Sequence, residues 1–142
     1  MAESAPLVAL DTNVVVRYLT RDDPVLAGKA RAIMRAARAG ETTLLLDPVA
    51  LSEVVFVLSS VYRRSNAAIS DALLSMLKHD WILVPDKPRY LHALRLFAAT
   101  IPHFGDACIC AASLESCEGK LYSFDRALSS VPGIHRSERP FK

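Results

Sequence analysis

The sequence predicts an α/β protein, an α/β/α arrangement in which helices cover both faces of a central parallel sheet of four to five strands. Two observations predict this class. Short apolar runs without polar alternation, typical of strands buried on both faces, recur along the chain, and segments with helical spacing separate them. A length of 142 residues is enough for one core and suggests no second one, so we expect a single domain over residues 1–142.

The first predicted strand covers residues 7–10 and ends at Asp11. Its unbroken apolar run predicts burial on both faces. Because ligands in such folds bind beyond the carboxyl ends of the strands, we expect Asp11 where the sheet carries out its chemistry. Thr12 or Asn13 is expected to cap the helix that follows. A simpler role, in which Asp11 only starts a turn, remains open.

A short helix over residues 14–19 and a longer one from Asp23-Pro24 to about Arg38 are predicted next. One face of the longer helix carries apolar residues at helical spacing: Val25, Ala30, Ile33, Met34 and Ala37. The other face carries a stripe of arginines: Arg31, Arg35 and Arg38. This stripe either contacts phosphates or an acidic partner, or is simply a solvated face.

A second strand over residues 42–46 leads into Asp47-Pro48, which repeats the helix-start signal, and into a helix over residues 49–62. The β-branched run at residues 54–57 favours a strand, but the start signal and the length favour a helix. Glu53 then lies on a mostly apolar helix. Because burying an unpaired carboxylate is costly, we expect Glu53 to be paired, protonated or bound to a metal.

Further helices are predicted over residues 66–78 and up to residue 99, on either side of a third strand over residues 81–84. Trp81 and the apolar stripes of these helices are expected in the core. Asp106 opens a helix with almost no polar face, which should therefore pack centrally. The acid in its first turn is explained either by function or by the preference of helix starts for negative groups.

The last part of the chain predicts a fourth strand over residues 120–123, after Gly119 has ended the preceding helix. Asp125 is then a second acid just past a strand. A short helical stretch and a fifth strand at residues 133–135 follow. The chain ends in a basic segment that is expected to be mobile and that contains Arg136, Arg139 and Lys142.

Composition limits the function classes. The net charge is only +2 and the basic residues are scattered, so any binding of nucleic acid must come from a site and not from bulk charge. Three cysteines fall in one predicted helix, and Cys108 and Cys110 point to different sides of it, which argues against a disulfide framework and against zinc. We expect buried thiols in a reduced, cytoplasmic protein. Neither residues 1–6 nor the interrupted apolar stretch at 44–61 has the pattern of an export or membrane segment.

Four acidic residues lie just after a predicted strand or near the start of a predicted helix. Asp11 and Asp125 follow strands, Glu53 lies in the helix after a strand, and Asp106 opens a buried helix. In a right-handed α/β winding all four can converge on one edge of the sheet. Carboxylates that meet in this way repel one another unless they are protonated or bind cations. Since no His or Cys cluster accompanies them, these hard oxygen ligands point to Mg²⁺ or Mn²⁺, and thus to phosphoryl chemistry.

Four segments, in this order, resemble the PIN domain: Leu10-Asp11-Thr12-Asn13, Ser52-Glu53-Val54, Phe104-Gly105-Asp106-Ala107 and Ser123-Phe124-Asp125-Arg126. The resemblance is closest to the VapC-type toxins of bacterial type II toxin–antitoxin systems, and it covers nearly the whole chain. No single segment is specific. Their order and their separations carry the resemblance.

The resemblance implies a parallel sheet with helices on both sides and a Mg²⁺- or Mn²⁺-dependent endoribonuclease. It also implies a homodimer and a cognate antitoxin whose C-terminal segment lies in the active-site groove. Carried over residue by residue, the catalytic acids, which we call the acidic quartet, are Asp11, Glu53, Asp106 and Asp125. Asn13 and Ser123 are then polar helpers, and Ser123 keeps a hydroxyl where many relatives have Thr.

The expected reaction is hydrolysis of an RNA phosphodiester by a metal-activated water. Asp11 and Asp106 are expected to hold one cation and Asp125 to lie nearer a second, while Glu53 holds or orients a water on the metal, directly or from outside its ligand shell. Basic residues near the ends of the motifs are candidates for binding RNA, although each is equally explained as a solvated residue: Arg17, Lys87, His103 and Arg126.

Two other functions fit parts of the sequence. A receiver-like or phosphatase-like α/β protein with a phosphorylated aspartate also gathers acids around Mg²⁺. Such proteins usually have a lysine near the end of a late strand, whereas Lys120 is at the start of its predicted strand. A non-catalytic PIN-like module that only binds RNA or a partner is the other alternative; an incomplete set of acids would favour it, and here the set is complete.

Overall fold

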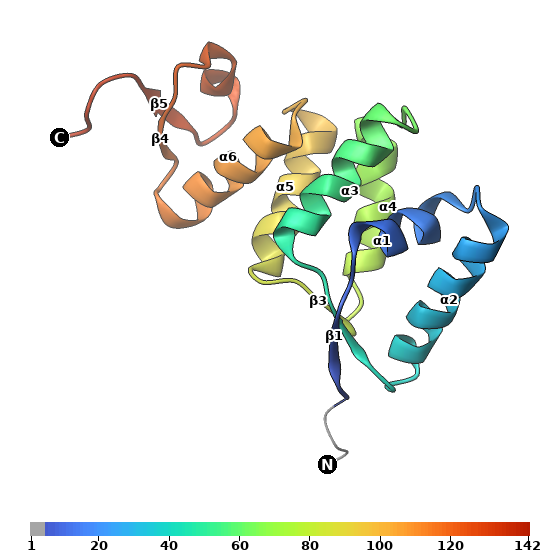
Figure 1. Ribbon diagram of the computed structural model, residues 1–142. Coiled ribbons are helices and arrows are strands. Elements are labelled where there is room, and N and C mark those ends of the chain that lie inside the picture. The colour runs from blue at the N-terminus through green and yellow to red at the C-terminus, as the bar shows by residue number, and fades with distance from the viewer. Residues whose placement is uncertain (1–4) are drawn as a thin grey trace. The chain divides into compact units, whose positions relative to one another are not determined.

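The computed structural model describes residues 5–142 and divides into two compact units, the first ending at Lys87 and the second running from Pro88 to Lys142. Each unit has its own parallel sheet, one of three strands and one of two (Figure 1). The chain is therefore mixed α/β, as predicted. Five strands are present in residues 5–142, within the predicted four to five: three pair in the first unit and two in the second.

The first unit alternates strands with pairs of helices, which confirms the predicted order. Its elements are β1 (Leu7–Ala9), α1 (Thr12–Thr20), α2 (Pro24–Arg38), β2 (Thr43–Leu45), α3 (Pro48–Ser60), α4 (Asn66–Leu77) and β3 (Ile82–Leu83). Helix α1 packs against α2 and α3, and α3 packs against α4. None of the helices in residues 5–142 combines the length and the apolar character needed to cross a membrane.

The sheet of the first unit has the order β1-β2-β3. Ala9 pairs with Leu45, and Leu45 pairs with Leu83, so the carboxyl ends of the three strands lie level. Strand β1 is at the edge of this sheet, and Leu7 and Val8 are 56% and 46% exposed. The prediction that this run is buried on both faces was wrong, because an apolar run does not reveal whether its strand is central or at an edge.

Local capping explains where α2 and α3 begin. The carboxylate of Asp23 accepts a hydrogen bond from the backbone N–H of Leu26 at 3.1 Å, and that of Asp47 accepts one from Val49 at 2.8 Å. Each acid is followed by proline, which lacks the N–H that a first helical residue leaves unpaired. Both Asp-Pro predictions are confirmed.

The core of the first unit is aliphatic. Fully buried side chains from β2, β3, α3, α4 and the residue after β2 form it: Leu44, Leu46, Leu51, Leu58, Ile69, Leu73, Leu77 and Ile82. Helix α2 contributes mainly small side chains, Ala27, Ala30 and Ala37, together with Met34. Val25 and Ile33 were predicted to face inward but are 68% and 38% exposed. Ile33 lies at the margin of the alanine face, through which the helix makes its contact, whereas Val25 lies on the opposite side of the helix.

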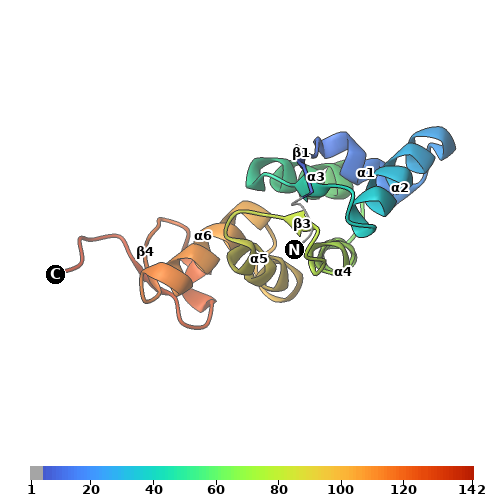
Figure 2. The same ribbon diagram turned by 90° about the horizontal axis from the view of Figure 1, so that it is seen from below.

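The second unit contains α5 (Lys87–Ala99), which begins at the last residue of the first unit, and then α6 (Phe104–Ser116), β4 (Lys120–Tyr122), the 3₁₀ helix η1 (Arg126–Ser130) and β5 (His135–Ser137). Helix α6 follows α5 after a short connection (Figure 2), and the rings of Phe97 and Phe104 meet edge to face at 5.7 Å. Aromatic pairs of this geometry stabilise a core beyond the area they bury.

A glycine brings β4 and β5 together. Gly119 has a φ of +81°, and a Cβ at this position would collide with the carbonyl of Gly133. The carbonyl of Gly119 accepts a hydrogen bond from His135 N–H at 2.7 Å, which starts the pairing of the two strands. Only glycine combines this backbone conformation with such a close approach.

The basic C-terminal segment is held in place and is not a mobile tail as predicted. Arg136 belongs to β5, and the Phe141 ring packs on Tyr122 at 5.1 Å. The backbone N–H of Phe141 also donates to the Tyr122 hydroxyl. The sequence-based prediction failed because these partners lie up to 19 positions away along the chain.

Replacing Asp47 tests the capping of α3. Asp47→Ala should lower the free energy of unfolding by about 1 kcal/mol, because the first N–H groups of α3 lose their acceptor, whereas Asp47→Asn should cost less. Urea unfolding at constant m-value measures the difference. Asp71→Ala, at an exposed acid inside α4, is the matched control and should change little. Equal losses for Asp47→Ala and Asp71→Ala would contradict a capping role.

Candidate functional site

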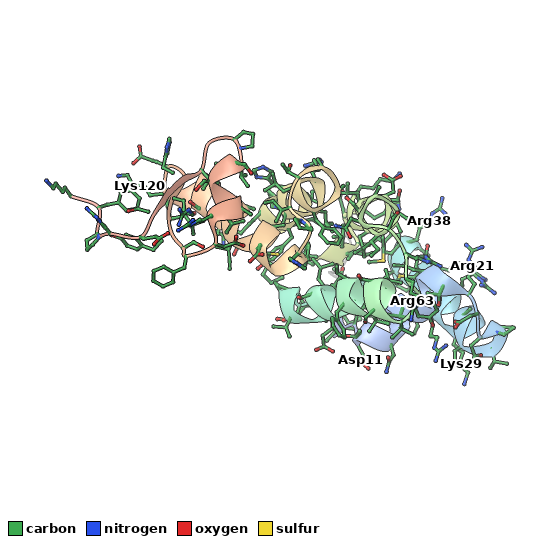
Figure 3. All side chains as sticks on the ribbon, turned by 90° about the horizontal axis from the view of Figure 1, so that it is seen from above. Asp11, Arg21, Lys29, Arg38, Arg63 and Lys120 are labelled. Carbon is green, nitrogen blue, oxygen red and sulfur yellow. The ribbon has the colours of Figure 1, made fainter. Side chains whose placement is uncertain are left out.

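Asp11 lies directly beyond β1, at the carboxyl edge of the three-stranded sheet. Leu10 N–H donates to Leu45 O at 2.8 Å, and Asp11, the next residue, occupies the N-cap position of α1. Unlike Asp23 and Asp47, it makes no capping hydrogen bond, and its side chain is exposed at the surface of the first unit (Figure 3). Its carboxylate oxygens are therefore available to a ligand, close to the positive end of a helix dipole.

The first turn of α1 also differs from the sequence-based expectation. Thr12 or Asn13 was predicted to cap this helix, but both are inside it, and the cap position belongs to Asp11. Thr12 is buried, whereas Asn13 is exposed, one turn before Arg17. The amide of Asn13 thus lies on the surface, two positions from the Asp11 carboxylate.

Glu53 is in α3, which packs against α1. Glu53 is exposed. The argument that it must be paired, protonated or bound to a metal assumed that it is buried, so that argument no longer applies. The buried face of α3 instead consists of Leu51, Val54, Val55 and Leu58. The sequence pattern suggested that Glu53 is buried because α3 is apolar nearly all round. However, even the apolar side chain of Phe56 in this helix is 69% exposed. Glu53 therefore has a carboxylate that water or a ligand reaches.

Arg17, a candidate for binding RNA, is partly engaged by an acid. Its guanidinium forms an ion pair with Asp22 at 3.2 Å. The Tyr62 hydroxyl donates to the same carboxylate at 2.8 Å, and this bond, helped by Thr20 and Arg17 and opposed by desolvation, lowers the pKa of Asp22 below its usual value. The Asp22 carboxylate thus accepts hydrogen bonds from Arg17, Thr20 and Tyr62, and its charge offsets part of the charge of Arg17.

Lys87, a second candidate, holds a turn of the backbone. Its ammonium donates to His79 O at 3.0 Å and to Ile82 O at 2.6 Å. Partial burial lowers the pKa of Lys87, and the nearby charge of Asp80 opposes this shift. Two of its three N–H donors are used in this way, which favours a structural role for Lys87 over contact with a phosphate.

The second unit brings Asp106 and Asp125 to one place. Asp106 is in the first turn of α6, one turn before Cys110, and Asp125 is the N-cap residue of η1. Burial is the main cause that raises the pKa of the Cys110 thiol, and the negative charges of Asp106 and Asp125 both add to it. Both carboxylates therefore act electrostatically on the same thiol of α6.

Ser123 and Arg136 hold the turn that carries Asp125. The Asp125 N–H donates to the Ser123 hydroxyl at 3.0 Å, and one Asp125 oxygen accepts from Ala127 N–H at 3.0 Å. The Arg136 guanidinium donates to Ser123 O and to Ser129 Oγ, each at 2.7 Å. Arg136 is a positioning residue that sequence reasoning missed. The predicted fifth strand, at residues 133–135, could have indicated this role. In the structure the strand begins two residues later and includes Arg136.

The remaining candidates are exposed side chains of the second unit. His103 occupies the N-cap position of α6 without a side-chain capping bond, and Arg126 is the first residue of η1. Within either unit, the described residues contain no group of three or more His, Cys, Asp or Glu side chains arranged to hold a metal. The first unit thus supplies Asp11 and Glu53, and the second supplies Asp106 and Asp125.

Comparison with models of protein families identifies a family for this chain. The family model of the PIN domain matches residues 8–134, which is most of the chain and includes all four of these acids. A search of curated proteins finds no match to this sequence.

Thiol reactivity tests the environment around α6. All three cysteines are free, and burial raises the pKa of Cys108 to about 11, so that about one thiol in a thousand is ionised at about pH 8. Iodoacetamide followed by peptide mass spectrometry should modify exposed Cys117 first, with Cys108 reacting faster as the pH rises toward about 11. Cys117→Ser should remove the fast reaction. Rapid modification of Cys108 below about pH 9 would contradict the described packing.

Proposed function

Since the chain belongs to the PIN-domain family, whose members are generally nucleases that use divalent metal ions, we propose that it is an endoribonuclease that requires Mg²⁺ or Mn²⁺. One observation supports the proposal most. Asp11 stands at the carboxyl edge of a parallel sheet with no capping bond, while the other N-cap aspartates use their carboxylates locally. An acid in this position without a structural role is suited to bind a ligand.

The donor chemistry of the acidic quartet fits a hard divalent cation. Its members offer only carboxylate oxygens, and Asp11, Asp106 and Asp125 are the residues that would hold the metal. When bound, Mg²⁺ or Mn²⁺ supplies positive charge for the phosphate oxygens and lowers the pKa of a water. The free oxygen atoms of Asp11 and the electrostatic effect of both Asp106 and Asp125 on the Cys110 thiol support this assignment.

The other site residues act through position and hydrogen bonding. Glu53, an exposed carboxylate, would accept a hydrogen bond from the attacking water and orient it toward the phosphorus atom. Ser123 holds the Asp125 turn through its hydroxyl. Asn13 would donate to a carboxylate or phosphate oxygen near Asp11. Arg126 and His103 are exposed and would contact phosphates of the RNA.

We further propose a biological role as the toxin of a toxin–antitoxin pair in the cytoplasm. The order and separation of the four motif segments, which resemble those of VapC-type toxins, support this role. The protein would then form a homodimer and be neutralised by a small cognate antitoxin whose C-terminal segment enters the active-site groove. The alternative of a phospho-aspartate receiver gains no support, because Lys120 is the first residue of β4 and not near its end.

Asparagine substitutions test the acidic quartet. Asp11→Asn and Asp106→Asn should each reduce the cutting of RNA with Mg²⁺ by at least about hundredfold, because each removes a negative ligand without changing side-chain size. Gel analysis of a mixture of transfer, ribosomal and messenger RNA measures the loss. Asp11→Asn should keep the unfolding midpoint of the wild-type chain, since Asp11 makes no capping bond. Asp106→Asn should lower it only slightly, because it removes one negative charge from the first turn of α6.

Asp71→Asn is the matched control at an exposed acid on α4 and should cut RNA normally. Retained cutting by Asp11→Asn would reject the site. If no variant and no wild-type preparation cuts RNA, while a small phosphoryl donor labels Asp11, the protein is a phospho-aspartate protein and the nuclease proposal fails.

Metal exchange tests the cofactor. EDTA should abolish cutting, and Mg²⁺ or Mn²⁺ should restore it, whereas Zn²⁺ should not, because the quartet lacks the nitrogen and sulfur ligands that zinc prefers. Binding of Mn²⁺, followed by electron paramagnetic resonance, should weaken in Asp106→Asn. Cutting at full rate in EDTA would contradict a metal-dependent mechanism.

A further inference from the structure

The arginine stripe of α2 faces a hollow on the first unit. Arg31, Arg35 and Arg38 line a pocket of about 170 Å³ together with Arg21, which follows α1. Three aromatic side chains and one methionine complete the lining: Tyr18, His79, Trp81 and Met34. The stripe is therefore part of a concave surface built from three segments of the chain, and not an isolated solvated face of one helix.

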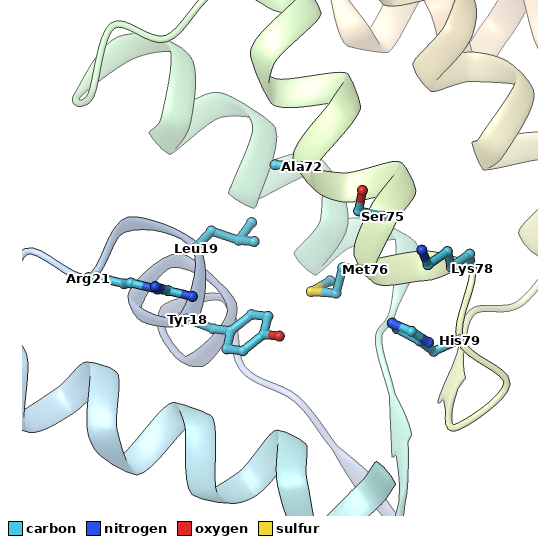
Figure 4. Close-up of a pocket in the computed structure, with 8 residues that line it drawn as sticks. All are labelled: Tyr18, Leu19, Arg21, Ala72, Ser75, Met76, Lys78 and His79. Atoms are coloured by element: carbon cyan, nitrogen blue, oxygen red, sulfur yellow. The ribbon is translucent and has the colours of Figure 1, made fainter.

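A second pocket of about 400 Å³ shares Tyr18, Arg21 and His79 with the first, so the two hollows adjoin, and we call them together the arginine groove. Figure 4 shows Tyr18 and Arg21, from the end of α1 and the residue after it, facing Met76 and His79 across this groove. Every residue that lines the groove belongs to the first unit.

The groove is positively charged without compensation. Neither pocket has an acidic residue in its lining. In the part of the chain that the structure describes, no carboxylate forms an ion pair with Arg21, Arg31, Arg35 or Arg38. Arginines elsewhere do have such partners, as Arg17 has Asp22. Clustered, unpaired guanidinium groups in a concave surface attract polyanions and suit phosphate oxygens.

The groove also offers flat aromatic surfaces. The rings of His79 and Trp81 are stacked, with centroids 4.8 Å apart and planes 12° from parallel. Lys87 fixes the turn between them through its bonds to the carbonyls of His79 and Ile82. Trp81 was predicted as a core residue but is only partly buried. A rigid, partly exposed stack beside free cations is the combination on which bases of single-stranded nucleic acid stack.

The groove and Asp11 lie at opposite ends of the parallel strands. Trp81 immediately precedes β3, and its carbonyl accepts a hydrogen bond from Leu44 N–H, so it lies at the amino end of the parallel strands. Asp11 lies beyond the carboxyl end of β1. In the register of the sheet, Trp81 is level with Leu7, so the two sites are about 13 Å apart along the strands.

We propose that the arginine groove is a second RNA-binding site, separate from the acidic quartet, that holds single-stranded RNA by phosphate contacts with its arginines and by stacking of a base on the His79–Trp81 pair. An acidic peptide would satisfy the arginines but would not use the aromatic stack. The choice of RNA as the ligand rests on the proposed function. The site itself rests on the geometry of the first unit.

The test measures binding without cleavage. A fluorescein-labelled uridine dodecamer is titrated with the full chain in EDTA, and fluorescence anisotropy gives the affinity. Trp81 is the only tryptophan, so its emission should be quenched when a base stacks on it. A dodecamer of abasic phosphodiester units carries the same charge without bases, and it should bind about fivefold more weakly or worse and leave the emission unchanged.

Charge-reversal variants locate the phosphate contacts. Arg31→Glu/Arg35→Glu should weaken binding of the uridine dodecamer by about tenfold or more and should reduce the slope of log affinity against log salt by about one unit. The matched control is Arg63→Glu/Arg95→Glu, which changes two exposed arginines outside the groove by the same total charge and should bind nearly as wild type. Trp81→Phe keeps an aromatic ring and should retain most of the affinity that Trp81→Ala loses.

The outcomes separate this proposal from the nuclease. Equal losses in the two double variants, or no tryptophan quenching by the uridine dodecamer, would overturn the groove as an RNA site even if the protein cuts RNA with Mg²⁺. Binding of polyglutamate as tight as that of the dodecamer would overturn RNA as its ligand. Conversely, groove-dependent binding with quenching would support the site even if the Asp11→Asn test rejected nuclease activity.

Discussion

The parallel register between β1 and β2 is the constraint on which the first unit depends. Because Ala9 pairs with Leu45, the chain leaves both strands at the same level. Asp11 and Asp47 then begin α1 and α3 from one edge of the sheet, and these two helices pack against each other. A slip of one residue would turn the side chains of β2 to the opposite face and bring Leu44 out of the core.

Signals that act within a few residues were predicted well. The Asp-Pro pairs at residues 23–24 and 47–48 cap helices because capping needs only an acceptor and an N–H two or three positions apart. The helical reading of residues 54–57 was also correct, against their β-branched composition. In that segment the start signal outweighed intrinsic propensity, which is weak compared with tertiary packing.

Properties that depend on distant partners were not predicted. The exposure of Leu7 follows from the edge position of β1, and the fixed position of Arg136 follows from its contacts with Ser123 and Ser129. Trp81 has an apolar body but lies beside four arginines that are far away in sequence. Among the site residues, Asp106 and Asp125 both influence the Cys110 thiol electrostatically, and the meeting of the four acids stays a prediction.

The proposed nuclease has a net charge of only +2, and its proposed catalytic site consists of acidic residues, yet its substrate is a polyanion. The carboxylates repel the phosphates that they are proposed to process, and divalent cations offset this repulsion only where they bind. A net charge of +2 supplies little attraction from the molecule as a whole. Affinity must therefore come from local cationic surface away from the acids. The unpaired arginines of α2, at the opposite end of the strands from Asp11, meet this requirement, because there they would attract RNA without neutralising the carboxylates that are proposed to hold the metal.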